Sequence, residues 1–152
     1  MSNMKKWNIR FLKLAKEIST WSKDPSTKVG SLVVDKNKRI VSTGYNGFPK
    51  GINDSSNRYN DRDIKYPMVL HSEMNCLLFA QRDLIDCTIY IYPMPPCARC
   101  SSAIIQSNIK KIVSIMPTKD QMKRWGDDFG LSKQMYNEAN IDFILYNKDI
   151  IK

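Results

Sequence analysis

Apolar residues recur along the chain with two different periods, which separate the expected helices from the expected strands. Between residues 4 and 23 they are spaced alternately four and three apart, with Lys and Glu on the opposite side, which predicts an amphipathic helix. Short apolar runs bounded by polar turns predict strands at 29–34, 40–45, 88–92, 111–116 and 141–146. Further helices are expected over 67–82, 97–107 and 128–139.

The order of these elements indicates the class of fold. The first two strands form a hairpin, and from there helices and strands alternate to the end of the chain. This order predicts an α/β protein in which helices cover both faces of one sheet. Residues 46–65 and 117–126 follow neither period, so we expect loops there. A chain of 152 residues is the size of one domain with one core.

Composition narrows the class of protein. Apolar residues make up 42% and charged residues 26%, with only 6 Gly and 7 Pro, which excludes a disordered or collagen-like chain. No apolar run approaches the ~20 residues needed to span a bilayer, so no membrane partner is expected. The first residues, MSNMKKWNIRFLK, have neither the core nor the cleavage site of a signal peptide, and we expect a cytoplasmic protein.

The formal net charge of +9 favours anionic partners such as nucleotides. Its equal alternative is a solvated basic surface that keeps the protein in solution, since the Lys and Arg residues are scattered. No basic stripe interleaved with aromatic residues marks a groove for a nucleic-acid strand, so nucleic acid is not expected as the partner.

The strongest chemical motif is H-x-E-x22-P-C-x-x-C, formed by His71, Glu73, Pro96, Cys97 and Cys100. Two cysteines three apart at a helix start can turn both sulfurs to one point, where the helix amides favour the thiolates that zinc binds. With His71 they supply three ligands. Three protein ligands leave a fourth tetrahedral position for water, which is typical of catalytic rather than structural zinc.

Glu73 lies beside this ligand set and is the candidate proton carrier. Alone, the histidine could be a core residue and the C-x-x-C a redox or structural motif. Together, in this order, they match the signature of zinc deaminases that act on nucleobases. The two remaining thiols, Cys76 and Cys87, are expected to point away from the site.

On these residues the chain resembles the cytidine/deoxycytidylate deaminase superfamily, and most closely its dCMP deaminases. DPSTKVG at 24–30, GYNGFPKG at 44–51, TIYIYPMPPCARC and SNIKKIV are similar to that branch as well, so the resemblance covers roughly 7–146. It implies a three-layer α/β/α fold with a mixed five-stranded sheet, and one deaminase domain over 1–152. It also implies zinc-dependent hydrolysis of dCMP to dUMP and ammonia, with Glu73 moving the proton.

Further site residues follow from the resemblance alone. Asn46 is similar to a residue that contacts the sugar, and Ser26 and Thr27 become candidate contacts for sugar or phosphate; for these two, simple turn chemistry is an equal alternative. Ser72 stands where the family usually has Ala, and its backbone amide suits the pyrimidine O2. Thr118 occupies the place of an aromatic residue that covers the substrate in some relatives.

The resemblance also implies the partners. The segment 52–66 has neither His nor Cys, so one zinc ion per chain is expected. The motif GYNG-x-P-x-G makes dCTP and dTTP candidate effectors, and a homo-oligomer, with a hexamer favoured, is the expected assembly. The alternatives are a zinc deaminase acting on another base (cytidine, guanine, tRNA adenosine or cytosine in single-stranded DNA) and a zinc-stabilised binding module without enzymatic activity.

Overall fold

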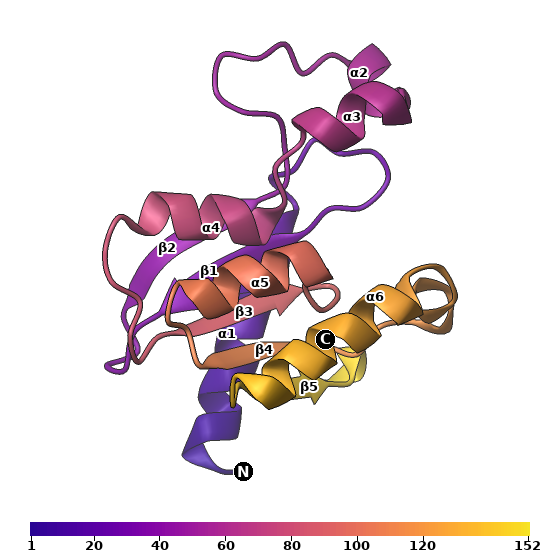
Figure 1. Cartoon of the computed structure of the whole chain (residues 1–152). Helices are drawn as coiled ribbons and strands as arrows, with labels where there is room; N and C mark the ends of the chain where they lie inside the picture. The colour runs from indigo at the N-terminus through magenta and orange to yellow at the C-terminus, as the bar shows by residue number, and fades with distance from the viewer.

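The computed structural model describes all 152 residues, and its centre is a five-stranded sheet in the order β2-β1-β3-β4-β5 (Figure 1). β1 runs antiparallel to both of its neighbours, β2 and β3, whereas β3, β4 and β5 are parallel to one another. The sheet is therefore mixed, as the sequence predicts. The strands are β1 (Gly30–Val34), β2 (Ile40–Tyr45), β3 (Thr88–Tyr92), β4 (Lys111–Ile115) and β5 (Asp142–Tyr146).

Helices cover both faces of the sheet and make three layers. One face carries α1 (Asn3–Ser19), which also packs against the C-terminal 3-10 helix η1 (Lys148–Ile151). The other face carries α4 (Ser72–Ala80), α5 (Ala98–Gln106) and α6 (Lys119–Glu138), which lie in front of the sheet in Figure 1. The expected α/β/α architecture is confirmed.

The two faces of the sheet bury two separate apolar clusters, because successive residues of a strand point to opposite sides. On the α1 side, Leu12 and Ile18 pack against Leu32 and Val113, all at most 1% exposed. On the other side, Ile104 of α5 packs with strand residues that include Ile89 and Ile112.

Two glycines allow helices to lie directly on strands. A Cβ at Gly30 would come within 2.2 Å of the carbonyl oxygen of Ala15 in α1. A Cβ at Gly44 of β2 would come within 2.3 Å of the Ser72 carbonyl oxygen and 2.6 Å of the Cys76 nitrogen. Because both neighbours of Gly44 are backbone atoms, this glycine sets how closely the first turn of α4 approaches the sheet.

The chain between β2 and α4 differs from the expectation. Two short helices, α2 (Ser56–Asn60) and α3 (Arg62–Met68), stand where a loop was predicted. The helix predicted over 67–82 is interrupted, because Leu70 exchanges two backbone hydrogen bonds with Gly47 instead of continuing a helix. The residue that follows this bridge, His71, is the N-cap of α4.

The start of α6 was also predicted wrongly. The helix begins at Lys119 rather than near residue 128, so most of the expected loop 117–126 is helical. Thr118 and Gln121 form a capping box, in which each side chain accepts a hydrogen bond from the other's backbone N–H. The pattern T-x-x-Q was the indication of this start, and Gly126 and Gly130 obscure the helical period after it.

None of the helices combines the length and the apolar character that crossing a membrane requires.

Candidate metal centre and active site

The site lies where the first turns of α4 and α5 meet. His71 has an extended backbone (φ −70°, ψ 156°) and precedes the first turn of α4. Its carbonyl oxygen accepts from the Asn75 N–H at 3.1 Å, and the Asn75 side chain donates to the Tyr45 carbonyl of β2 at 2.8 Å. The histidine is therefore held on the end of a helix that is itself fixed on the sheet.

The two cysteines come from α5. Cys97 is the N-cap, and its sulfur accepts a hydrogen bond from the backbone N–H of Cys100 at 3.4 Å. The N-terminus of α5 is held by α6, because Asp128 Oδ2 accepts from the Ala98 N–H at 2.8 Å. No local pattern in the sequence points to Asp128, since its partner lies 30 residues away.

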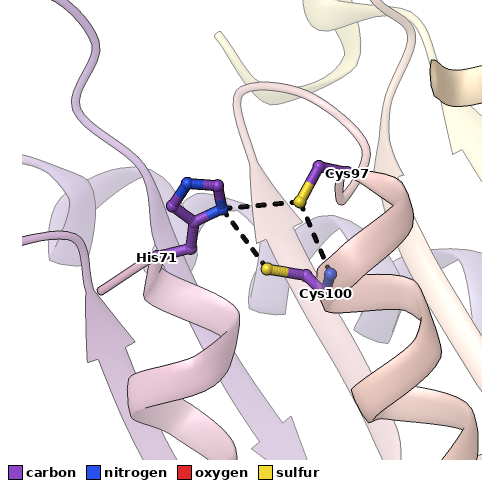
Figure 2. Close-up of side chains that lie close together, drawn as sticks. All are labelled: His71, Cys97 and Cys100. Atoms are coloured by element: carbon purple, nitrogen blue, oxygen red, sulfur yellow. Dashed lines mark hydrogen bonds between the residues drawn. The ribbon is translucent and has the colours of Figure 1, made fainter. Parts of the chain in front are cut away.

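Figure 2 shows the His71 ring turned toward both sulfurs. His71 Nδ1 lies 3.5 Å from Cys97 Sγ and 3.3 Å from Cys100 Sγ. Zinc–nitrogen bonds of ~2.0–2.1 Å and zinc–sulfur bonds of ~2.3 Å at tetrahedral angles place such donors about 3.6 Å apart. The His71 ring thus lies at the distance from both sulfurs that one zinc ion requires, and all three donor atoms lie within 4.8 Å of one another. His71 lies at the surface, whereas Cys100 is buried.

The charges of the three ligands are linked. The hydrogen bond with Cys100 is the largest effect on the pKa of the Cys97 thiol. Together with the hydrogen bond to the His71 ring, it lowers this pKa to about 4. In turn the Cys97 sulfur raises the pKa of His71. The Cys97 sulfur, burial and the Glu73 carboxylate raise the pKa of Cys100. The cluster therefore releases its first thiol proton easily, and a bound cation would favour release of the others.

Glu73 is not part of the ligand cluster, as predicted. Its side chain is 3% exposed, and burial raises the pKa of its carboxyl group. The Ser72 hydroxyl donates to Glu73 Oε1 at 2.6 Å, which opposes the effect of burial. This hydrogen bond orients the carboxylate beside the cluster, and the sequence analysis missed it.

The remaining thiols lie away from the site. Cys76 Sγ lies 3.3 Å from the Ser42 hydroxyl oxygen beneath α4, and burial raises the pKa of this thiol to about 11. Cys87 is buried just before β3, in the apolar cluster on the same face of the sheet. Both placements agree with the prediction.

The predicted sugar and phosphate contacts lie together on one loop cluster. The Asn46 amide donates to Asp24 Oδ2 at 3.2 Å and to the Thr27 carbonyl at 2.8 Å, and its oxygen accepts from the Val29 N–H at 2.9 Å. Asn46 therefore has a structural role, and its contact with a sugar stays a prediction. The Ser26 N–H donates to Asp24 Oδ1 at 2.8 Å, which is turn chemistry.

The hydroxyl of Thr118 also has a structural partner, because it caps α6. Its predicted place over the substrate is untested.

The comparisons with known proteins identify the family. The family model described as the cytidine and deoxycytidylate deaminase zinc-binding region matches residues 5–116. An "Uncharacterized deaminase in luxG 3'region" of Aliivibrio fischeri is 42% identical over 147 residues, which are 97% of this chain and 98% of that protein. The deoxycytidylate deaminase of Homo sapiens is 30% identical over 143 residues, covering 90% of this chain and 78% of the human protein.

A solved structure shows the same fold. The dCMP deaminase of the cyanophage S-TIM5, in complex with dCMP and dUMP, superposes with a TM-score of 0.75 at 24% identity. The alignment covers 96% of this chain and 99% of the phage protein. With the family model and both relatives spanning most of its length, this chain belongs to the cytidine and deoxycytidylate deaminase family.

Proposed function

We propose that this protein is a zinc-dependent hydrolase that converts dCMP to dUMP and ammonia, with one zinc ion per chain. The observation that carries the proposal is the convergence of His71, Cys97 and Cys100 at the spacing of zinc ligands, beside the buried Glu73. Relatives named deoxycytidylate deaminase or probable deoxycytidylate deaminase support dCMP as the substrate over the other candidate substrates.

The residues divide the chemistry between them. His71 Nδ1 and the two sulfurs would hold a zinc ion, whose chemistry when bound is Lewis-acid activation of a water molecule. Glu73 takes a proton from the attacking water and delivers it to N3 of the pyrimidine. The hydroxyl adds at C4, and Glu73 then moves the remaining proton of that hydroxyl to the amino group. The C4–N bond breaks as C4=O forms, so that water is consumed and ammonia leaves.

The surroundings of Glu73 suit this role. Burial disfavours the charged carboxylate, whereas the Ser72 hydroxyl favours it, so both protonation states are accessible to one group during a turnover. The Ser72 backbone amide remains the proposed contact for the pyrimidine O2.

The residues that would contact the sugar and phosphate of the nucleotide are candidates from the sequence. The side-chain hydroxyls of Ser26 and Thr27 are candidate sugar or phosphate contacts, next to the ordered turn at Asp24. The candidate effectors dCTP and dTTP and the hexameric assembly stay predictions from the resemblance.

The test is a deamination assay on zinc-loaded protein, following the release of ammonia with dCMP, cytidine, guanine and single-stranded DNA as parallel substrates. Turnover of dCMP well above the others supports the proposal. Turnover of a different base would reassign the substrate while leaving the site intact. An absence of turnover with every base, in protein that holds one zinc per chain, would overturn the proposed activity.

A further inference from the structure

Three polar residues lie buried together, and two of them, Lys65 and Asp24, have no part in the proposed chemistry. The Lys65 ammonium donates to Asp24 Oδ1 at 2.9 Å, and these side chains are only 9% and 4% exposed. The other carboxylate oxygen accepts from Asn46 Nδ2 at 3.2 Å. Lys65, Asp24 and Asn46 are referred to below as the clamp.

The clamp joins three separate parts of the chain. Lys65 belongs to α3, Asp24 to the turn between α1 and β1, and Asn46 to the segment directly after β2. Asn46 is held in addition by the backbone of Thr27 and Val29, so its position relative to β1 is set by three side-chain hydrogen bonds. The ion pair therefore ties α3 to a rigid point.

The connection continues to His71 through the backbone. Gly47 follows Asn46 and exchanges hydrogen bonds with Leu70, at 3.1 Å and 2.8 Å. The chain returns from Leu70 to α3 through Val69, whose N–H donates to the Lys65 carbonyl at 2.8 Å. This closes a ring of contacts, and His71 is the first residue beyond it.

His71 has few other restraints. Its side chain contacts only the two sulfurs through hydrogen-bonding atoms, and its carbonyl is held by α4. On its N-terminal side, the Leu70 bridge is what holds the backbone. We propose that the clamp positions His71 as a metal ligand, by fixing Leu70 against Gly47. This inference rests on the proposed zinc site.

The chemistry of the clamp favours positioning over stability. A buried ion pair stabilises a fold little compared with apolar side chains of the same volume, because both charges lose their hydration. Its directional hydrogen bonds do specify one arrangement of the groups they join. A second ion pair, between Lys23 in the turn after α1 and Asp54 in the loop after β2, has a distance of 2.9 Å but is exposed. It provides a matched control.

The experiment compares Lys65→Met with Lys23→Met as zinc-free and zinc-loaded full-length chains. Zinc affinity is measured by competition with a chromophoric chelator. Exchange of the Leu70 amide proton, followed by NMR in the zinc-free chain, reports directly on the bridge to Gly47. Because His71 is the only histidine, its ring nitrogen resonances report metal coordination without ambiguity.

We expect Lys65→Met to weaken zinc binding by roughly ten- to a hundredfold. This is the range of affinity lost when a group that orients a metal ligand is removed. The Leu70 amide should exchange faster, and Lys23→Met should change neither quantity. Since Lys65→Met leaves the Asp24 charge buried without a partner, the chain could fail to fold. The double variant Lys65→Met/Asp24→Asn removes that charge and is expected to fold while still binding zinc weakly.

A folded Lys65→Met or double variant with the zinc affinity and the Leu70 exchange rate of the original chain would overturn the clamp. An original chain that binds no zinc would instead overturn the proposed function. The clamp would in that case be judged by the exchange of Leu70 alone, so the two failures can be told apart.

Discussion

The Ser72 hydroxyl donates a hydrogen bond to Glu73 Oε1 at 2.6 Å, between two side chains that are 0% and 3% exposed. Neighbouring residues of one helix turn thus supply both the proposed proton carrier and the group that stabilises its charged form. Burial raises the pKa of Glu73, and the Ser72 hydrogen bond is the largest of the interactions that lower it.

Ser72→Ala should shift the acid limb of the pH–rate profile to higher pH. Loss of the hydroxyl removes an interaction that lowers the Glu73 pKa, so the carboxylate is protonated at higher pH than before. A proton acceptor is inactive once protonated, and activity should therefore fall more at pH 6 than at pH 8. Steady-state kcat/KM between pH 5 and 9 measures this, with Ser102→Ala on the exposed side of α5 as control. An unshifted limb would contradict the role of Ser72.

Glu73→Gln should lower kcat by roughly 10²–10⁴-fold, because the amide cannot accept and return a proton. Zinc content should stay at one ion per chain, since Glu73 lies outside the ligand cluster. Rate assays combined with elemental analysis check both statements. Glu138→Gln, at the exposed end of α6, is the control for a changed charge alone. Substantial activity in Glu73→Gln would show that another group carries the proton.

Zinc affinity should fall as pH falls. The Cys97 sulfur raises the pKa values of both His71 and Cys100, so at low pH protons occupy the positions that zinc needs. Each proton that zinc displaces changes the affinity by about tenfold per pH unit. Chelator competition at pH 6, 7 and 8 measures the slope, and an affinity independent of pH would mean that the ligands are already deprotonated without metal.

Gly44→Ala should destabilise the protein and disturb the site. The added Cβ would meet backbone atoms of Ser72 and Cys76 at 2.3 and 2.6 Å, which forces α4 away from β2 at a cost of about 1–3 kcal/mol. Zinc affinity should fall as well, because His71 moves with α4. Urea unfolding and chelator competition measure the two effects.

Gly130→Ala is the matched substitution in α6. Nothing lies within 4 Å of its added Cβ, and Ala is favoured over Gly in a helix by about 0.8–1 kcal/mol. It should therefore stabilise the chain and leave zinc binding unchanged. Equal effects at Gly44 and Gly130 would show that the close approach of α4 to β2 is unimportant.

The two errors in the predicted elements have different origins. The start of α6 was predictable, because a T-x-x-Q capping box is a local pattern, but Gly126 and Gly130 weaken the apolar period that would draw attention to it. The break between α3 and α4 was not predictable locally. It depends on the pairing of Leu70 with Gly47, residues 23 positions apart, which competes with helical hydrogen bonding.

The predicted substrate contacts show the same division. Asn46 was singled out as a sugar contact, yet its amide holds Asp24, Thr27 and Val29 together. Hydrogen bonds between segments that meet only on folding cannot be read from residue type, so sequence reasoning recognised an important residue without its role in the fold.

The sequence by itself determined the chemistry of the site. The identity of His71, Cys97 and Cys100, and the spacing of the two cysteines on one helical turn, depend on local geometry and are already present in the motif. Only the tertiary structure decided how those groups are held. The cap of Asp128 on α5 and the buried pair of Lys65 and Asp24 are contacts between distant segments, which no local pattern encodes. The hydrogen bond between the adjacent residues Ser72 and Glu73 depends on how packing orients their two side chains.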